Sequence, residues 1–179
     1  MLNTTASLTH TTVLPKGTTR PQAVALVQDH EHFIKCDPHM ISYKTKTPET
    51  APAPLPEWVS AKWKLVDGAK PPVVYEVTDR ISALPKGLWD SDVVSTSEFW
   101  DLEDGVFVRL HSPLSILMET VWSVRHGDGG DLELVEDVLI SCSRLLVGIV
   151  KGQCDSNWKG IHGNVVKKLG GEPVAVAAS

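Results

Sequence analysis

The sequence predicts an α+β fold in which a curved antiparallel sheet of six or seven strands wraps around one long C-terminal helix. From residue 40 to residue 142, apolar and polar side chains mostly alternate, which is the period of a half-buried strand. From residue 143 to residue 169, apolar side chains recur at spacings of three and four, which is the period of a helix. A long antiparallel sheet must curl and cover one face. Only this helix is long enough to do so, and we expect a cavity between the two.

Two short helices are expected near the N-terminus, after a first strand at residues 10–14. Residues 1–8 are small and polar and are expected to be loose. Thr19 is a good N-cap for the first helix, and Gln22, three residues later, can complete a capping box. The second helix is expected at residues 30–36, where it stops before a proline.

The alternating region divides into strands at turn residues. One hairpin is expected to turn through residues 102–105, with Gly105 supplying a left-handed position. The expected strands span residues 40–47, 57–66, 73–84, 93–101, 106–111, 116–125 and 132–142.

The C-terminal helix is expected to span residues 143–169 and to end at a Gly-Gly pair. Four glycines inside it each weaken it by about 1 kcal/mol relative to alanine, so it needs the sheet for stability. A chain of 179 residues suits one domain. We expect that domain over residues 9–169 and a flexible tail over residues 170–179.

The composition excludes several classes of protein. The chain has 17 Lys and Arg against 22 Asp and Glu, and this thin net charge of −5 argues against a nucleic-acid partner. No apolar run is long enough to span a membrane, and the first ten residues lack the pattern of a secretory signal. Three cysteines without a CxxC pair fit a reducing compartment. We therefore expect a cytoplasmic protein.

No cofactor and no metal ion are expected. The sequence has no glycine-rich nucleotide-binding motif, no nucleophile elbow and no HExxH motif. Residues 29–39 are rich in possible ligands, and the four-residue spacing of His32 and Cys36 would place them on one helix face. No second ligand pair follows at metal-site spacing, so polar capping of a helix end is the favoured interpretation.

The six tryptophans outnumber the three phenylalanines and two tyrosines together. Tryptophan combines a large apolar surface with one N–H, and it often lines ligand pockets. We expect Trp63, Trp89, Met118 and Trp122 to border the cavity, because alternation places the last two on one apolar strand face. Plain core packing is the alternative for each of them.

Three residues are candidates for catalysis. Alternation places Tyr75 and Asp79 on the apolar face of one strand and Glu136 within the apolar row of another. A carboxyl group in such surroundings must be paired, hydrogen-bonded or raised in pKa, and a raised pKa is how a general acid is made. The alternative is that Asp79 and Glu136 are structural acids, each satisfied by an arginine or by backbone.

Arg109 and His111 share the other face of the strand at residues 106–111. A register that pairs Glu98 with Arg109 would form a cross-strand ion pair. If this face lines the cavity, Arg109 and His111 can stabilise negative charge that develops on a substrate carbonyl. If the face is exposed, both are ordinary surface residues, and the sequence leaves the two interpretations open.

Three stretches carry a resemblance to a known family. They are Leu26…Asp29-His30-Glu31…Ile41, Val77-Thr78-Asp79-Arg80-Ile81…Leu88-Trp89, and Glu136-Asp137…Cys142 leading into the long helix. With the order of elements, they resemble the START-like, pollen-allergen-like helix-grip superfamily (SRPBCC), and within it an uncharacterised group of small fungal proteins. The resemblance implies a helix-grip fold, an apolar small-molecule ligand and an association with natural-product pathways, in which some helix-grip proteins are cyclases.

Two functions follow as hypotheses. The first is a cofactor-independent cyclase, isomerase or Diels-Alderase-like cycloaddition catalyst for a hydrophobic polyketide or terpenoid intermediate, acting largely by orienting its substrate. The second is a non-catalytic carrier of a hydrophobic small molecule, and a protein-interaction module is a weaker third. An unpaired acid in the pocket favours the enzyme, and a uniformly apolar pocket favours the carrier. A homodimer is left open.

Overall fold

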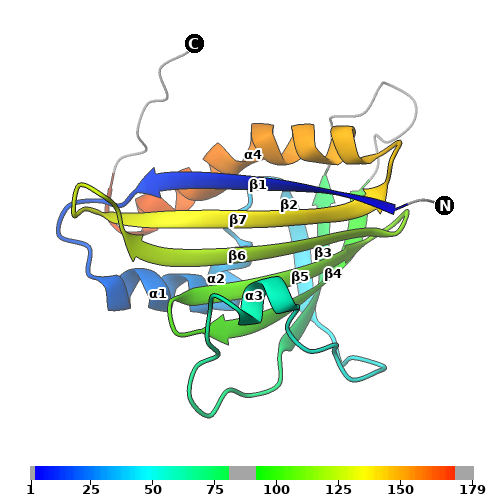
Figure 1. The fold of residues 1–179 in the computed structure, drawn as a ribbon, viewed down its shortest axis with the longest axis horizontal. Helices are drawn as coiled ribbons and strands as arrows, with labels where there is room; N and C mark the ends of the chain where they lie inside the picture. The colour runs from blue at the N-terminus through cyan, green and yellow to red at the C-terminus, as the bar shows by residue number, and fades with distance from the viewer. Residues whose placement is uncertain (1–2, 81–91, 172–179) are drawn as a thin grey trace.

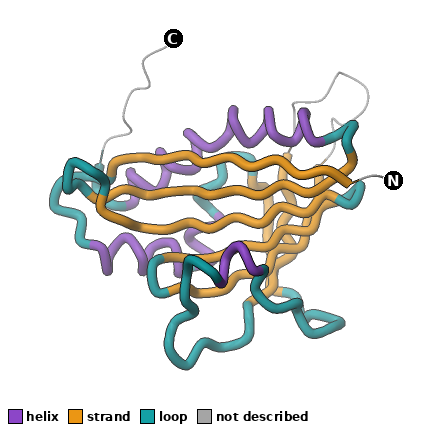
Figure 2. Tube along the Cα trace, in the orientation of Figure 1, coloured by secondary structure: helices purple, strands orange, loops and turns teal. Residues whose placement is uncertain are grey.

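The computed structural model describes residues 3–80 and 92–171. In these residues, an antiparallel seven-stranded sheet curves around helix α4 (Val147–Lys168), and the short helices α1 (Arg20–Gln28) and α2 (His30–Ile34) cover one end (Figure 1 and Figure 2). The strands lie in the order β1-β7-β6-β5-β4-β3-β2. Their bounds are β1 Asn3–Val13, β2 Met40–Thr45, β3 Val73–Arg80, β4 Asp92–Leu102, β5 Gly105–Ser112, β6 Ile116–His126 and β7 Leu132–Ser143. This confirms the predicted helix-grip fold.

Strand β1 corrects the expectation of a loose N-terminus. It starts at Asn3, and its pairing with β7 runs from Asn3 opposite Ser143 to Val13 opposite Glu133. The expectation was wrong because strand pairing uses backbone groups. The small polar side chains of β1 do not reveal the strand, because its position is determined by backbone hydrogen bonds to the neighbouring strand β7.

The start of α1 follows its sequence signal. The backbone N–H of Gln22 donates to the side chain of Thr19, and the backbone N–H of Thr19 donates to the side chain of Gln22, which completes the predicted capping box. Helix α2 ends at Ile34, two residues before the expected end.

The segment at residues 57–66 is not the expected strand. It holds the short helix α3 (Glu57–Ser60), which starts after Pro56 on the convex face of the sheet, and only Leu65 forms an isolated bridge with Leu102. Val59 of this helix is buried. The apolar residues of this segment recur at intervals that fit both a strand and a helix. Alternation alone therefore could not distinguish a strand from a segment that crosses the convex face of the sheet.

The hairpin between β4 and β5 forms as expected, but Gly105 serves a different purpose. Gly105 is not among the described residues with positive φ, so no left-handed turn requires glycine here. Instead, a Cβ added at Gly105 would overlap the carbonyl group of Trp122 on the neighbouring strand β6. Glycine is needed because the two backbones approach so closely.

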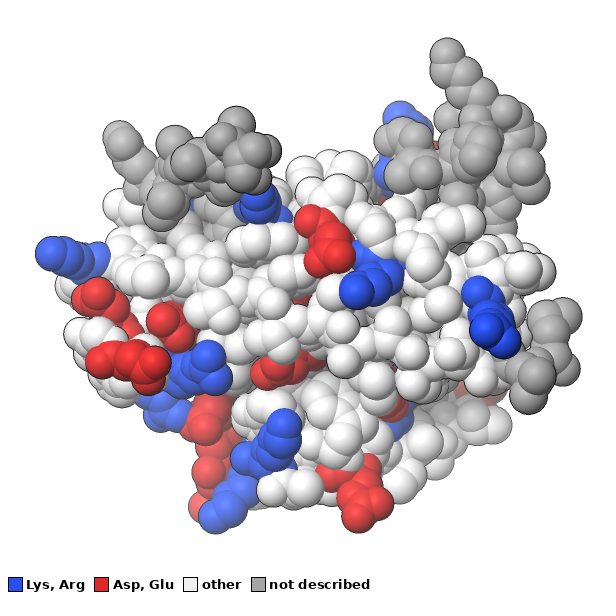
Figure 3. All heavy atoms as spheres, turned by 45° about the horizontal axis from the view of Figure 1, so that its top comes forward, with Lys and Arg blue, Asp and Glu red and all other residues white. Residues whose placement is uncertain are grey.

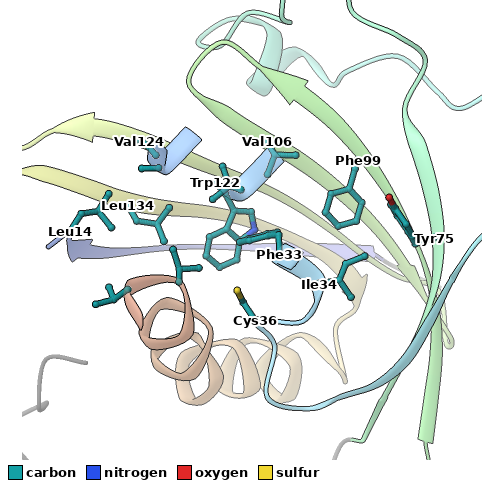
Figure 4. Close-up of a cluster of buried hydrophobic side chains, with 14 of the residues drawn as sticks. Leu14, Phe33, Ile34, Cys36, Tyr75, Phe99, Val106, Trp122, Val124 and Leu134 are labelled. Atoms are coloured by element: carbon teal, nitrogen blue, oxygen red, sulfur yellow. The ribbon is translucent and has the colours of Figure 1, made fainter. Parts of the chain in front are cut away.

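The main core lies between the concave face of the sheet and the helices α1, α2 and α4. Figure 4 shows Trp122 in its middle beside Phe33, with Tyr75 and Phe99 together toward β3. Two smaller clusters complete the interior, one on the convex face under α3 and one where Val150 of α4 meets β7.

Helix α4 is fastened to the rest of the molecule at its C-terminal half. Val165 and Val166 are buried in the main core. The Asn164 side-chain amide donates to the Cys36 carbonyl at 2.9 Å. Gly160 faces Pro38 so closely that a Cβ there would lie 2.9 Å from the proline ring. The helix therefore depends on tertiary contacts, as its glycines predicted.

On the face in Figure 3, lysine and arginine side chains are interspersed among aspartate and glutamate, and several of both kinds lie together at the lower left. Among the described residues, no helix combines the length and the apolar character needed to cross a membrane.

We predict that Gly105→Ala lowers the free energy of unfolding by at least about 2 kcal/mol, because the added methyl group must push the β6 backbone away. Urea denaturation measures this change. Gly148→Ala in α4 is the control, since its Cβ meets nothing within 4 Å and alanine favours the helix. Unchanged stability of Gly105→Ala would show that the hairpin accommodates a side chain at this position.

Candidate functional site

A cavity of about 300 Å³ lies between α4 and the concave face of the sheet. Its apolar wall comes from strands β5 and β6 and from one face of α4. Its polar lining combines three carboxyl groups with His39, Arg80, Ser95, Ser112, Gln153 and Asn157. The apolar lining residues are Leu110, Ile116, Met118, Val150, Cys154, Trp158 and Ile161. The acidic ones are Asp37, Asp79 and Glu136. This volume lies at the lower end of the range for small-molecule pockets.

Asp79 is a half-buried acid, and one of its oxygens is fully buried without a hydrogen-bond partner among the described residues. Strand β3 turns its side chain to the concave face, and Oδ1 is buried with no partner among the described residues. The neighbouring Arg80, one of the arginines that could have satisfied Asp79, pairs with Asp92 instead, Nε to Oδ1 at 3.2 Å. Burial raises the pKa of Asp79 to about 6, with a smaller contribution from the negative charge of Asp37 and opposition from His39.

Asp37 is the second acid on this side of the cavity. Burial raises the pKa of Asp37, and the backbone N–H of His39, which donates to Oδ1 at 2.8 Å, partly offsets the rise. The negative charge of Glu136 adds a smaller increase to the pKa of Asp37. Asp37 is thus coupled both to Asp79 and to Glu136, which places the three carboxyl groups in one electrostatic cluster.

Glu136 is a buried acid with partners. Its Oε2 lies 2.8 Å from Nδ1 of His10 on the adjacent strand β1, and Nε2 of His10 lies 3.1 Å from Oδ1 of Asp155 on α4. A second imidazole, His162 of α4, places Nε2 at 3.6 Å from the same Glu136 oxygen. The indole ring of Trp158 stacks on His10 with ring centroids 4.8 Å apart. We call His10, Glu136 and Asp155 the carboxylate–histidine chain.

Four residues of this site, His10, His162, Asp155 and Asp37, were not predicted from the sequence. His10 was not recognised because the first strand was expected to begin at this residue rather than at Asn3. His162 had a usable signal, since it follows Trp158 by four residues and so lies on the same face of α4. It is almost completely buried, with 1% of its surface exposed.

Five of the expected site residues lie on the concave face. Asp79, Glu136 and Met118 line the cavity wall. Trp122 lies in the main core, edge-on to Phe33 at 5.0 Å between ring centroids.

Tyr75 also lies in the main core rather than on the cavity wall. Its ring packs edge-on against Phe99 with centroids 5.4 Å apart. Burial raises the pKa of the Tyr75 hydroxyl, with smaller increases from neighbouring acidic groups, first of them Glu31. The Tyr75 side chain therefore packs in the core of the sheet and does not contact the cavity.

Three expected cavity residues lie on the convex face, which corrects their assignment. Trp63 packs with Trp58, edge-on at 6.0 Å between ring centroids, in the cluster under α3. Arg109 and His111 are on the face of β5 that points away from the cavity. Alternation gave the correct pairs of faces but not which face was concave. Trp89, the fourth expected cavity residue of this group, lies outside the described residues.

Arg109 is neither a cavity residue nor a surface residue. It pairs with Glu98 as expected, Nη1 to Oε2 at 3.1 Å, and also with Glu119, Nε to Oε1 at 3.3 Å. Its guanidinium donates to the backbone carbonyls of Ala53 and Pro54 at 2.8 and 2.6 Å. Arg109 therefore holds the segment between β2 and α3 onto the sheet.

His111 is half exposed beside this ion-pair cluster, with Nε2 at 3.5 Å from Oε1 of Glu98. The two possible ligands on the second helix, His32 and Cys36, have other partners. His32 pairs with Asp29, and the buried Cys36 thiol contacts the His32 carbonyl. Among the described residues, no group of three or more His, Cys, Asp and Glu has the arrangement of a metal site.

One family model covers nearly the whole described chain. A family described as a domain of unknown function (DUF7053) matches residues 3–171. The chain belongs to this family. No curated protein matches the chain.

Solved structures share the fold at low sequence identity. An uncharacterised protein from Rhizobium leguminosarum has a TM-score of 0.53 and 10% identity, over 94% of this chain and 97% of that one. The protein TTHA0849 from Thermus thermophilus has a TM-score of 0.50 and 13% identity, over 93% and 97%. Ara h 8.0201 has a TM-score of 0.49 and 13% identity, over 92% and 99%. The first two comparisons show a common fold. They do not identify a function, which must be inferred from the residues of the site.

We predict that Asp79→Asn stabilises the protein at pH 7 and not at pH 4. The ordinary pKa of 3.8 applies in the unfolded chain and about 6 in the folded protein. Between these values the folded state binds more protons, so wild-type stability falls as pH rises through this window. The neutral variant escapes this loss, which amounts to about 2 kcal/mol.

Urea denaturation at pH 4 and pH 7 checks this prediction. Glu76→Gln is the control, because the hydrogen bond from Lys44 lowers the pKa of Glu76 instead. A constant stability difference between wild type and Asp79→Asn at both pH values would contradict the placement of Asp79 in a buried site.

Proposed function

We propose that this protein binds a compact hydrophobic molecule in the cavity under α4 and catalyses its cyclisation or isomerisation without a cofactor. The observation that carries the proposal is the Asp79 carboxyl group, buried at Oδ1 without a partner among the described residues, on the wall of a mainly apolar cavity. Burial raises its pKa to about 6, so about a tenth of the Asp79 side chains carry a proton at pH 7, far more than at the ordinary pKa of 3.8. That proton is available to a substrate carbonyl.

The chemistry of such a site is orientation plus one proton donor. The apolar wall selects a folded conformer of the substrate, and Asp79 hydrogen-bonds to the carbonyl oxygen on which negative charge develops. A polyketide or terpenoid intermediate of a fungal natural-product pathway fits this description as the substrate class, and a cycloaddition that needs only a polarised carbonyl fits the same site. The cavity volume favours a compact molecule over a long acyl chain.

A carrier function is the alternative, and the apolar wall favours it. Seven of the lining residues are apolar, and they would hold a pigment or terpenoid without any chemistry. A carrier gains nothing from a buried, unpartnered carboxyl group, which costs stability. Asp79 is therefore the residue that separates the two functions.

We predict that Cys154→Phe abolishes ligand binding, because this side chain on α4 lines the cavity and the added ring fills it. Binding is measured with the uncharged fluorophore N-phenyl-1-naphthylamine and by mass spectrometry of molecules that co-purify with the protein. Gly152→Leu is the matched control on the same helix, because Gly152 is exposed. Equal binding by wild type and Cys154→Phe would contradict the cavity as the ligand site.

Catalysis is tested with the co-purified molecule. Incubation with fresh wild-type protein is expected to convert it or its precursor into an isomer of the same mass, and Asp79→Asn should slow this about 10²–10³-fold. If wild type binds the molecule tightly and leaves it unchanged, the protein is a carrier.

A further inference from the structure

We infer that Glu136 is the proton acceptor of this site, so that the reaction is a proton transfer between an acid and a base on one cavity wall. The inference rests on the proposed function and narrows it to isomerisation, or cyclisation through an enol, rather than cycloaddition. Three observations carry it: the position of Glu136, the carboxylate–histidine chain behind it, and the contrast with Asp79.

Glu136 has the position that a base needs. It lines the same cavity as Asp79 but comes from β7, whereas Asp79 comes from β3 near the other edge of the sheet. Asp37 is electrostatically coupled to both carboxyl groups. His10 contacts Oε2 of Glu136, and a carboxylate has two oxygens, so Oε1 remains to take a proton.

The chain behind Glu136 supplies hydrogen bonds to its ionised form. Each ring nitrogen of His10 faces a carboxyl oxygen, Glu136 on one side and Asp155 on the other. A neutral imidazole has one N–H, so both contacts are hydrogen bonds only when the ring, or one of the carboxyl groups, carries a further proton. The carboxylate–histidine chain is therefore built to hold an exchangeable proton.

His162 adds to this environment from the other side. Its Nδ1 lies 2.7 Å from the Thr12 hydroxyl, and its Nε2 is buried without a hydrogen-bond partner among the described residues, 3.6 Å from Glu136 Oε2. A small displacement brings this nitrogen within hydrogen-bond distance of the carboxyl group. A buried imidazole that points at an acid already contacted by another imidazole is more than packing requires.

The contrast with Asp79 assigns the two roles. Asp79 Oδ1 is buried with no described partner, which suits an acid, whereas Glu136 has an imidazole at hydrogen-bond distance, which suits a base. In the forward step, a C–H proton next to a substrate carbonyl moves to Glu136, and Asp79 gives its proton to the carbonyl oxygen, forming an enol. Return of the Glu136 proton to another carbon and of the enol proton to Asp79 yields an isomer and restores both groups. No electron acceptor or co-reactant is needed.

The test uses 5-nitrobenzisoxazole, a small apolar carbon acid. Loss of its C–H proton to a carboxylate forms the nitrile while the N–O bond breaks, and the leaving oxygen becomes a coloured phenolate. We expect wild type to accelerate this elimination and Glu136→Gln to lose about 10²–10³-fold in kcat at an unchanged dissociation constant for the probe. Asp137→Asn is the matched control, with the same charge change on the opposite face of β7, and should keep the wild-type rate.

His10 is tested as a positioning residue. His10→Ala should lose at least about tenfold in kcat, and added imidazole should restore the rate, because it can again bridge Glu136 and Asp155. Furan, a ring of similar size without an N–H, should not restore it. Equal rescue by furan would show that His10 only fills space.

The outcomes separate the inference from the proposed function. If 5-nitrobenzisoxazole and the fluorophore both fail to bind wild type, the cavity function and the inference fail together. If the probe binds but wild type does not accelerate its elimination, or Glu136→Gln eliminates it as fast as wild type, Glu136 is not the base and the binding function stands alone.

Discussion

The packing of α4 into the curve of the sheet is the contact on which the rest of the structure depends. The helix contains four glycines and would be unstable by itself. It persists because Val165 and Val166 enter the main core, Val150 packs on β7, and Gly160 lets Pro38 approach. The same packing leaves a cavity of about 300 Å³ between the helix and the sheet. Stability and binding space thus come from one interface.

The cavity treats its acids in two ways. Glu136 contacts His10, which in turn contacts Asp155. These hydrogen bonds compensate for the cost of burying the Glu136 carboxyl group. Asp79 has no such support at Oδ1, and Arg80, which also lines the cavity, pairs with Asp92. Two acids of similar intrinsic strength are therefore placed in different environments within one pocket. This asymmetry distinguishes the site from a simple apolar container.

Much of the fold could be predicted because it depends on patterns among residues that are close in the sequence. The capping box at Thr19, the β4–β5 hairpin and the apolar stripe of α4 each depend on neighbours in sequence, and each is present. The segment at residues 57–66 could not be assigned, because whether Trp63 packs inside or outside the sheet depends on the path of the whole crossing segment. The placement of Arg109 at the cavity was wrong for a similar reason. Alternation identifies two faces, and only closure of the sheet decides which one is concave.

The candidate site was predictable only in part, because its partners are far apart in the chain. Glu136 could be predicted because it is an acid in an otherwise apolar row of strand residues. Nothing in the sequence near His10 indicates that it contacts an acid 126 residues later. The pairing of β1 with β7 has the same long reach, from Asn3 to Ser143. During synthesis the strand that emerges first must therefore wait for almost the whole domain before it finds its partner. Contacts of such high sequence separation form slowly, and β1 stays available to other chains meanwhile. The carboxylate–histidine chain and the last edge of the sheet thus assemble in the same late step, so a nascent or truncated chain that ends before β7 has neither.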